Sequence, residues 1–514
     1  MGRSPRLKTR SRPLAAASLA AATAALAATA WHIKTNVAPP SWDDAWYLET
    51  SFRLWTALKT SPLAFARAYV DAFHIKAPLI SLVPLPLYSL FGMGERVAVW
   101  ANLPLAALAS WAWYRAAAEW WKDHPRGRDA AVLGGALTAL VPLAYGLSRI
   151  FFVETLVSCL LALFAWRCAA AKRGDRREGV ILGTLLGLGL LAKVTFPLFA
   201  AGFIWAARDR LKPHAKPALL TAVLVASTWY AENALYVLGF AWSAGFGRVA
   251  RDYAGGGGLA ARVDWLLSIL RNGISWPLAA AMGAVAAAAG AGGVRRLDDG
   301  GRAALWGLAP LLVYMAGVNH DVRMAMPLLA LPVLLAARAA VSFSNPSARA
   351  LAAAALLGAG LWTCADQTFR AGPDRALAYN GAPSSDAGWD RAALVDAAVR
   401  AGGPDAVAAV ALEHRNLNAN NLSSLAAARA LPLTFVNLGY AQDSVEAAMI
   451  RLKDKGASVL ILVDGLPESE LPAFLNRTNA GIADAVRSGR LPAAETGRVE
   501  VANGVSARVF RLER

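Results

Sequence analysis

Two adjacent carboxylates, Asp43 and Asp44, stand among three aromatic residues in the stretch 42–47. Aromatic rings of this kind favour the headgroup level of a membrane. Carboxylates need water or a cation there, because an unpaired charge is costly in lipid. A reaction site at a membrane surface would use both kinds of group. The alternative is an aromatic belt beside two aspartates that cap a helix, and the stretch by itself does not decide between the two.

Further polar groups lie at the predicted outer ends of later apolar segments. They are His74, Lys76, Arg149, Glu154, Lys193, Asn233, His320, Asp321 and Arg323. Each alone has an ordinary explanation, such as a lysine whose stem is buried while its charge reaches water. Ionisable groups within membrane segments are nevertheless candidates for a functional site. Together these residues would line an outward-facing cavity with carboxylates and cations.

The composition is that of a polytopic membrane protein. Of the 514 residues, 56% are apolar and only 17% are charged, whereas soluble domains have about 45–50% apolar residues. The net charge of +17 does not indicate nucleic acid, because the basic residues form short clusters between apolar segments, as cytoplasmic loops do. We expect a lipid bilayer as a partner and no nucleic acid. The cysteines lie in or beside apolar segments and form neither a disulfide framework nor a metal-binding spacing.

The basic clusters also predict an orientation. Residues 13–31 form a first span, and the basic residues before it place the N-terminus in the cytoplasm. An outer loop follows, with an amphipathic stretch at 47–69 that would lie along the membrane surface. The proline-rich stretch 78–91 either crosses the membrane or dips into its surface. We favour the dip, because the basic run 122–128 then falls on the cytoplasmic side.

The composition changes at Asp366. Strands are expected at 407–412, 433–436, 458–463, 499–501 and 507–512, and helices at 420–430, 444–454 and 468–488. This alternation indicates a small α/β domain with a mostly parallel sheet and a closing hairpin. We therefore predict an α-helical polytopic membrane domain of about 11–13 transmembrane helices over 1–365. A soluble α/β domain outside the cytoplasmic (inner) membrane would occupy 366–514.

The order of the motifs resembles the GT-C superfamily of polyprenyl-phosphate-sugar-dependent glycosyltransferases, glycosyltransferase family 39 type. Residues 43–47 are similar to its Asp-(Asp/Glu)-x-x-Tyr motif, 76–79 to Lys/His-x-Pro-Leu, 187–193 to Gly-Leu-x-x-Leu-(Thr/Ala)-Lys, 229–233 to Pro-Trp-Tyr-x-x-Asn, and 323–327 to Arg-Tyr-x-x-x-x-Pro. Arg149 and Glu154 resemble the acidic position of its second outer loop. The resemblance covers about 14–340, and the branch it resembles most is the bacterial protein-mannosyltransferase/aminoarabinose-transferase type. The chain departs from the family at Ala77 and Glu154, where proline and aspartate are frequent.

The resemblance implies an inverting transfer of a sugar from a polyprenyl-phosphate donor to a glycan, lipid or protein acceptor. Asp43 would be the general base, with Asp44 and Glu154 as further catalytic candidates. Donor phosphate and sugar would be bound by His74, Lys76, Arg149, Lys193, Asn233 and Arg323, and Lys76 and Arg323 would neutralise the phosphate. No cofactor is certain. Asp44, Glu154 and His74 are candidates to hold a divalent cation, Mg²⁺ or Mn²⁺ on carboxylates and Zn²⁺ if the histidine takes part.

Two other functions fit the same features. A transporter or flippase of lipid-linked sugars would also use buried charges and broken helices, such as the short apolar stretches 180–191 and 195–206 that meet at Lys193. Such a protein would be expected to show paired repeats, and the sequence has none that we can identify. A non-catalytic assembly subunit would keep the GT-C-like fold and lose the base.

Overall fold

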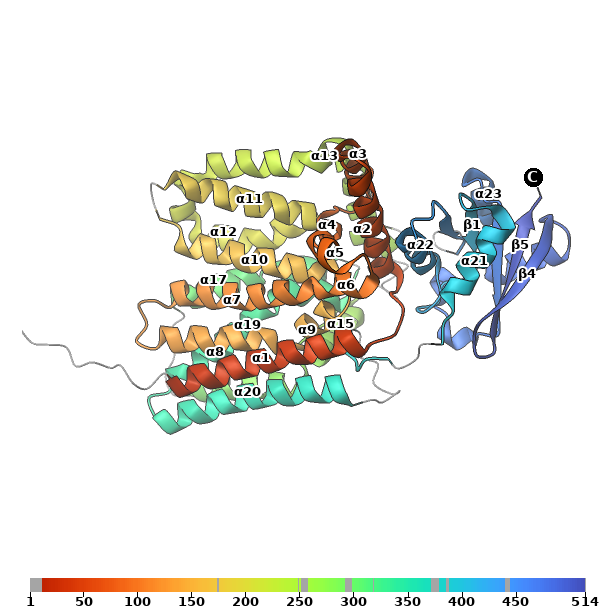
Figure 1. The fold of residues 1–514 in the computed structure, drawn as a ribbon. Helices are drawn as coiled ribbons and strands as arrows, with labels where there is room; N and C mark the ends of the chain where they lie inside the picture. Colours follow the sequence, from red (N-terminus) through yellow and green to blue (C-terminus); the bar gives the residue numbers. More distant parts are fainter. Residues whose placement is uncertain are drawn as a thin grey trace, which may run out of the picture.

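The computed structural model describes residues 12–172, 175–247, 249–250, 258–291, 298–317, 319–370, 379–384, 388–439 and 444–513. Part of the expected basic clusters, residues 3–11 and 295–297, lies outside the described residues. The described part consists of a large helical bundle followed by a small α/β domain (Figure 1). The expected fold class is therefore confirmed.

The bundle is a stack of roughly parallel and antiparallel helices. Its members are α1 (Arg12–Thr35), α7 (Asn102–Trp120), α8 (Gly127–Ala139), α9 (Pro142–Ser148), α10 (Val153–Ala170), α11 (Arg176–Ala192), α12 (Phe196–Leu211), α13 (Ala215–Gly245), α15 (Leu259–Ser268), η2 (Ile269–Ile274), α16 (Trp276–Ala291), α17 (Asp299–Leu308), α18 (Pro310–Ala316), η3 (Val322–Leu328), α19 (Ala330–Ser342) and α20 (Pro346–Phe369). Helices α13, α11, α10, α7, α8, α1 and α20 pack side by side in this order (Figure 1). Helix α10 is buried along most of its length and forms the centre of the stack.

The chain is a multi-pass membrane protein. By length and composition, three described helices, α1, α10 and α20, are able to cross a membrane, and up to six spans result if each of three bent helix pairs counts as one. Helix α13 exposes large apolar side chains, including Leu220, Leu235 and Trp242, as expected of a surface that faces lipid rather than water. The expected number of about 11–13 spans stays a prediction.

Two helices run across the ends of the bundle helices instead of along them (Figure 1). They are α2 (Trp42–Thr60) and α3 (Pro62–Val70), and the break between them follows from Ser61, whose hydroxyl accepts the N–H of Ala64 and caps α3. This is the amphipathic surface segment expected at 47–69. It begins earlier than expected, so that Asp43 and Asp44 lie in the first turn of α2, where negative charge is favourable.

The proline-rich stretch forms short helices near the α2 end of the bundle. They are α4 (Leu79–Leu82), α5 (Leu85–Phe91) and α6 (Glu95–Trp100). Helix α4 packs against α2 and α11, and α5 packs against α2 and α6. Whether this stretch dips into the membrane surface or crosses it stays a prediction.

The two short apolar helices expected at 180–191 and 195–206 form α11 and α12 and meet at Lys193, as expected. Helices α11 and α12 are separate and pack against each other, and the chain turns at Lys193 between them. The turn is tight because Gly189 has no side chain: a Cβ there would lie 2.1 Å from the ring of Phe196.

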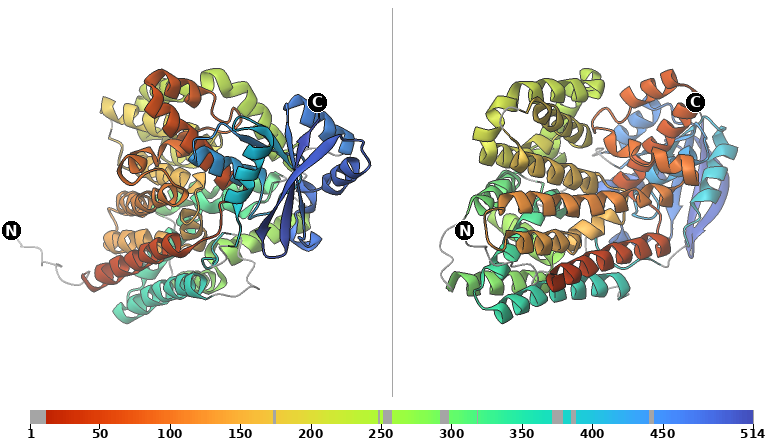
Figure 2. Two further views of the ribbon diagram at one scale, coloured as in Figure 1. Left: turned by 45° about the vertical axis from the view of Figure 1, so that its right-hand side comes forward. Right: turned by 60° about the vertical axis from the view of Figure 1, so that its left-hand side comes forward.

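The C-terminal domain contains a five-stranded sheet with the order β2-β1-β3-β5-β4. Its elements are α21 (Arg391–Gly402), β1 (Val407–Val410), α22 (Ala419–Ala428), β2 (Thr434–Asn437), α23 (Val445–Asp454), β3 (Val459–Asp464), α24 (Asn479–Arg487), β4 (Ala493–Ala502) and β5 (Val505–Leu512). Strands β1, β2 and β3 are parallel, whereas the β4–β5 hairpin is antiparallel. Helices cover both faces of the sheet (Figure 2). The single helix expected over 468–488 is wrong, because Pro472 interrupts it and only α24 and two short 3-10 turns form.

The two parts of the chain are joined near α2. Helix α22 packs against α2, and the guanidinium of Arg391 forms a bidentate ion pair with Glu95 of α6, with both N–O distances at 3.1 Å. The expected domain boundary at residue 366 falls inside the last turn of α20, which continues to Phe369. The α/β domain therefore lies at the bundle end that carries Asp43 and Asp44.

Gly202 allows a close approach of α12 and α17, because a Cβ at this position would lie 2.1 Å from the carbonyl oxygen of Trp306. We expect Gly202→Ala to lower the free energy of unfolding by roughly 1–3 kcal/mol through overpacking. Gly239→Ala in α13 is the matched control, since nothing lies within 4 Å of its Cβ position. Melting temperatures in detergent measure both, and equal values for the two variants would contradict this packing.

Candidate active site

The carboxylate of Asp43 lies between two cations from distant parts of the chain. Lys76 Nζ is 2.6 Å from Oδ1, and one terminal nitrogen of the Arg323 guanidinium is 3.2 Å from Oδ2. The Asp43 side chain keeps 29% of its surface exposed, so the cluster opens to the outside of the bundle. Burial alone would raise the pKa of Asp43, but the charges of Lys76 and Arg323 outweigh it and hold that pKa well below its usual range. Three expected site residues thus meet.

Lys76 is carried by a strained loop between α3 and α4. Phe73 and His74 both adopt left-handed backbone conformations, with φ values of 59° and 57°, which are costly for residues with side chains. Two residues of α13 hold the loop in this shape. Asn233 bonds to His74 Nδ1 through its Oδ1 at 2.8 Å and donates to the Val70 carbonyl oxygen at 2.9 Å, and the Trp229 indole donates to the Ala72 carbonyl oxygen.

The structure brings His74 and Asn233 together, and their expected role in donor binding stays a prediction. They were expected to bind donor phosphate and sugar, and in the structure their side chains are bonded to each other. Their common effect is to fix the loop that presents Lys76. In this structure both are positioning residues, which act on the site through the backbone of this loop.

Arg323 is oriented by a chain of polar contacts. It lies in η3, and its Nε is 2.9 Å from Oδ2 of Asp321, whose Oδ1 also accepts the backbone N–H of Arg323. The hydroxyl of Tyr379 donates to both oxygens of Asp321, at 3.2 and 3.0 Å. The guanidinium lies over the ring of Phe152, with 5.1 Å between Cζ and the ring centroid. These contacts leave the guanidinium little freedom to turn away from Asp43.

A second ion pair lies near this cluster, where Lys193 also contacts the residue after Arg323. Lys193 Nζ is 2.9 Å from Glu154 Oε1 and 3.4 Å from the sulfur of Met324, the residue after Arg323. Glu154 is only 2% exposed, so its charge is balanced by Lys193 in a site that water barely reaches. The two charges of the pair balance each other, and Lys193 links the pair to η3 through Met324.

Asp44 does not face the cations. It is 6% exposed, and its Oδ1 accepts the backbone N–H of Phe151 at 3.0 Å. This bond ties the first turn of α2 to the turn before α10. Burial raises the pKa of the Asp44 carboxyl to about 7, which the Phe151 N–H partly opposes.

Arg149 is also separate from the cluster. Its guanidinium donates to the Thr368 hydroxyl of α20 at 2.5 Å and lies 4.6 Å from the centroid of the Tyr145 ring. No contact of the described residues brings it to Asp43. The expectation that Arg149 joins the donor site is therefore not met by this geometry.

The candidate metal ligands do not converge. Asp44 bonds to the Phe151 backbone, Glu154 pairs with Lys193, and His74 bonds to Asn233. Within the described ranges, no group of three or more His, Cys, Asp or Glu side chains is arranged to hold a metal ion. The residues of the cluster do not fit a divalent cation, and we derive no step through one.

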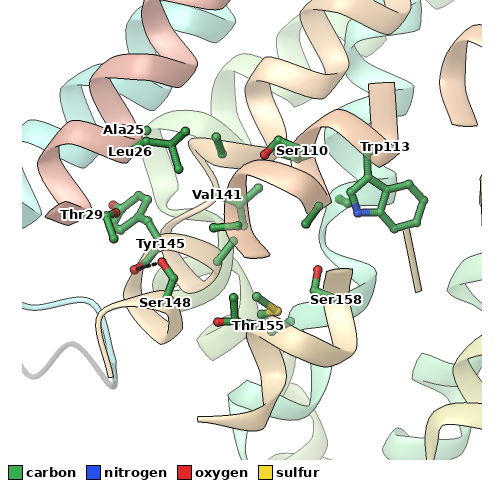
Figure 3. Close-up of a pocket in the computed structure, with 17 residues that line it drawn as sticks. Ala25, Leu26, Thr29, Ser110, Trp113, Val141, Tyr145, Ser148, Thr155 and Ser158 are labelled. Atoms are coloured by element: carbon green, nitrogen blue, oxygen red, sulfur yellow. Dashed lines mark hydrogen bonds between the residues drawn. The ribbon is translucent and has the colours of Figure 1, made fainter. Parts of the chain in front are cut away.

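A small cavity lies inside the bundle and is distinct from the charged cluster (Figure 3). It is lined by residues of α1, α7, α9 and α10, among them Thr29, Tyr145, Ser148, Thr155 and Ser158. The Ser148 hydroxyl donates to the Tyr145 carbonyl oxygen at 2.8 Å. The lining is mostly apolar with a few hydroxyl groups, and none of the three residues of the Asp43 cluster lines it.

Two residues that contact the site were not predicted from the sequence. Tyr379 follows α20 in a segment without a recognisable motif, and Glu413 lies after β1, where its carboxylate accepts the Trp42 indole N–H at 3.0 Å. Both reach the site across more than fifty residues of sequence. Asp321 was expected to line the outward-facing cavity beside Arg323, but it was given no catalytic or binding role.

The pKa of Asp44 leads to a prediction about stability. Because the folded-state pKa of about 7 exceeds the ordinary value of 3.8, ionisation opposes folding. The corresponding stability is fully present below about pH 4 and is lost as the pH rises to about 7. We expect Asp44→Asn, which can still accept the Phe151 N–H, to match the wild type in melting temperature near pH 4 and to exceed it at pH 8. A difference that is constant across this range would contradict the assignment.

Part of the bundle also matches a known family. Residues 75–231 match the family model described as dolichyl-phosphate-mannose-protein mannosyltransferase. The matched segment contains Lys76, Glu154 and Lys193 and ends before Arg323. No curated protein sequence is similar enough to this chain to count as a match.

Several solved structures share the architecture of almost the whole chain. ArnT from Cupriavidus metallidurans, bound to undecaprenyl phosphate, is 12% identical with a TM-score of 0.58, covering 96% of this chain and 97% of ArnT. AglB, the oligosaccharyltransferase of Archaeoglobus fulgidus, in complex with an inhibitory peptide and a dolichol-phosphate, is 11% identical with a TM-score of 0.56, covering 87% and 69%. Arabinofuranosyltransferase AftD from mycobacteria is 15% identical with a TM-score of 0.53, covering 97% of this chain and 40% of AftD. The chain therefore has the fold of the GT-C membrane glycosyltransferases.

Proposed function

We propose that this protein is an integral-membrane glycosyltransferase that moves a sugar from a polyprenyl-phosphate donor to an envelope glycan, lipid or protein acceptor. The observation that carries the proposal is the convergence of Lys76 and Arg323 on a single exposed anion, the carboxylate of Asp43. Two cations so placed are suited to a phosphate group, which Arg binds as a fork and Lys as a point charge.

The carboxylate of Asp43 occupies the place that the donor phosphate would take. Both groups are anions that accept hydrogen bonds, so a phosphate that enters the cluster competes with Asp43 for Lys76 and Arg323. Once the phosphate has displaced the carboxylate from these cations, they no longer depress the pKa of Asp43. The carboxylate then becomes a better base at the moment the donor is in place.

The reaction follows from this exchange. The acceptor hydroxyl attacks the anomeric carbon of the sugar, and Asp43 takes the hydroxyl proton. The new bond joins the acceptor oxygen to the anomeric carbon, while the bond from that carbon to the phosphate oxygen breaks. Attack opposite to the leaving group inverts the anomeric configuration. Lys76 and Arg323 stabilise the second negative charge that develops on the departing polyprenyl phosphate.

The relatives support the chemical class of the donor. Two of the similar structures contain a polyprenyl phosphate, undecaprenyl phosphate in ArnT and dolichol-phosphate in AglB. The family matched by residues 75–231 is named for a dolichyl-phosphate-mannose donor and a protein acceptor. A polyprenyl phosphate is common to all three, and we carry only this class of donor to the present chain.

The same proposal includes an orientation. We place the site and the α/β domain on the outer face of the cytoplasmic membrane, with the N-terminus inside. This follows the positive-inside rule, because the basic clusters then lie in the cytoplasm. Helix α2, which carries Asp43, lies at the end of the bundle that faces the α/β domain (Figure 1). A test of which side of the membrane the domain lies on therefore applies to both.

Substitutions in the cluster distinguish the role of Asp43 as the base from the contacts of Lys76 and Arg323 with the phosphate. We expect Asp43→Asn to lower the transfer rate about 10²–10⁴-fold, while binding of polyprenyl phosphate is unchanged or tighter because a competing anion is lost. Lys76→Ala and Arg323→Ala should each weaken that binding, since a hydrogen bond to a charged group contributes roughly 1.5–3 kcal/mol. Rates come from purified protein with a lipid-linked sugar donor, and affinities from titration with polyprenyl phosphate.

Lys59→Ala is the control for these variants, because this lysine also lies on α2 but its amine packs over the Trp55 ring, 4.9 Å from the centroid. It should change neither rate nor affinity. Transfer by Asp43→Asn at the wild-type rate would refute the role of the base. Unchanged phosphate binding in both cation variants would refute the phosphate site.

The orientation is tested with single cysteines. The native cysteines are all buried, so their background labelling is low. A cysteine in place of Asn503, which is exposed in the β4–β5 turn, should react with a membrane-impermeant thiol reagent in intact spheroplasts. Asn345→Cys at the exposed start of α20 is the control for the opposite end of the bundle, and it should react only after lysis. The reverse pattern would refute the orientation.

A further inference from the structure

Trp42, the residue directly before Asp43, has an unusual backbone conformation. Its φ is 40°, in the left-handed region that bulky side chains rarely adopt. Such a conformation persists only where the surroundings hold it in place. The contacts of Trp42 therefore bear directly on where Asp43 lies.

Two contacts of Trp42 come from the α/β domain. The indole N–H donates to Glu413 Oε2 at 3.0 Å, and the side-chain amide of Asn420 donates to the Trp42 carbonyl oxygen at 3.1 Å. One bond fixes the side chain and the other fixes the peptide that leads into Asp43. Between them they determine the orientation of the first turn of α2.

Glu413 is itself held firmly before it meets Trp42. Only 3% of it is exposed. Its backbone N–H donates to Asn476 Oδ1 at 2.8 Å, and the Asn476 amide donates back to its carbonyl oxygen at 2.9 Å. Because Glu413 is buried and its backbone is bonded to Asn476, it can fix the position of the Trp42 indole instead of adapting to it.

We propose that Glu413 and Asn420 are positioning residues of the transfer reaction, which hold Trp42 and thereby set the position of the Asp43 carboxylate beside Lys76 and Arg323. The inference rests on the proposed function and deepens it. It makes the α/β domain a part of the catalytic unit, because the orientation of the base is set from outside the membrane domain. Without the two bonds, Trp42 relaxes to an ordinary helical φ and the start of α2 turns, which carries Asp43 away from the cations.

The protonation state of Glu413 suggests a conservative replacement. Burial raises its pKa to about 8, although hydrogen bonds to the carboxylate partly oppose this. The group is therefore largely neutral at pH 7, and glutamine has nearly the same shape and can also accept the indole N–H. Glu413→Gln should keep the contact, whereas Glu413→Ala removes it.

The full-length protein in detergent or nanodiscs allows a direct test with two readouts. One is the kcat and donor KM of sugar transfer, and the other is the affinity for polyprenyl phosphate alone, which does not require transfer. We expect Glu413→Ala and Trp42→Phe to lower kcat about tenfold to a hundredfold, as misplacement of a catalytic group does, with donor KM not increased. Both should bind polyprenyl phosphate more tightly, because Asp43 no longer competes for the cations. Glu413→Gln should stay within about twofold of the wild type in both readouts.

A matched control separates positioning from simple docking of the domain. Arg391→Gln breaks the ion pair between Arg391 of the α/β domain and Glu95 of α6. This ion pair also joins the two parts of the chain, but neither of its residues touches Trp42. It should leave kcat and phosphate affinity unchanged even where it lowers the melting temperature. Trp42→Phe keeps the bulk at position 42, so the test stands if Glu413→Ala does not fold.

The outcomes are distinct for the two claims. If the wild type transfers sugar but Glu413→Ala and Trp42→Phe match it in both readouts, the positioning role is refuted and the proposed function stands. The same conclusion follows if Arg391→Gln changes both readouts as strongly as Glu413→Ala. If the wild type binds polyprenyl phosphate but transfers no sugar from any polyprenyl-phosphate donor, the proposed function fails. In that case, a changed affinity of Glu413→Ala for polyprenyl phosphate would still support the claim that the Glu413–Trp42 contact sets the position of Asp43.

Discussion

The ion-pair cluster of Asp43 with Lys76 and Arg323 is the interaction on which the rest of the structure depends. Its members lie 33 and 280 residues apart in sequence, so the fold of the membrane domain is needed to bring them together. Two cations placed this close repel each other unless an anion lies between them. The surrounding structure supplies this anion from α2 and fixes each cation by separate contacts. The need to hold two cations and an anion together explains why Asn233, Tyr379 and Glu413 all form hydrogen bonds around this cluster.

Three supports converge on the cluster from different parts of the chain. Helix α13 fixes the strained Lys76 loop through Asn233. The segment after α20 fixes Arg323 through Tyr379 and Asp321. The α/β domain contacts the residue before Asp43. Asp321 contacts the Arg323 guanidinium directly, whereas Asn233, Tyr379 and Glu413 act through neighbouring residues. Such an arrangement suits a site whose anion must exchange during the reaction.

The sequence predicted the charged atoms of the cluster better than their supports. Asp43, Lys76 and Arg323 could be found because each lies in a short local motif beside an apolar segment. Tyr379 and Glu413 could not, because their roles arise from contacts between segments far apart, and a single tyrosine or glutamate carries no local signal. The same limit explains why His74 and Arg149 were expected to touch the donor: their chemistry suits an anion, but only the fold shows that they bond to Asn233 and Thr368. The α/β domain was predictable from its alternating pattern, except at 468–488, where the effect of Pro472 was underestimated.

The central claim is that the donor phosphate displaces the Asp43 carboxylate from Lys76 and Arg323. A cryo-electron microscopy or crystal structure of the full chain with bound polyprenyl phosphate measures this most directly. Our account predicts a phosphate within hydrogen-bonding distance of Lys76 Nζ and the Arg323 guanidinium, with the Asp43 carboxylate moved off both cations and open to an acceptor. A phosphate bound elsewhere, with the Asp43 ion pairs still intact at their present distances of 2.6 and 3.2 Å, would contradict it.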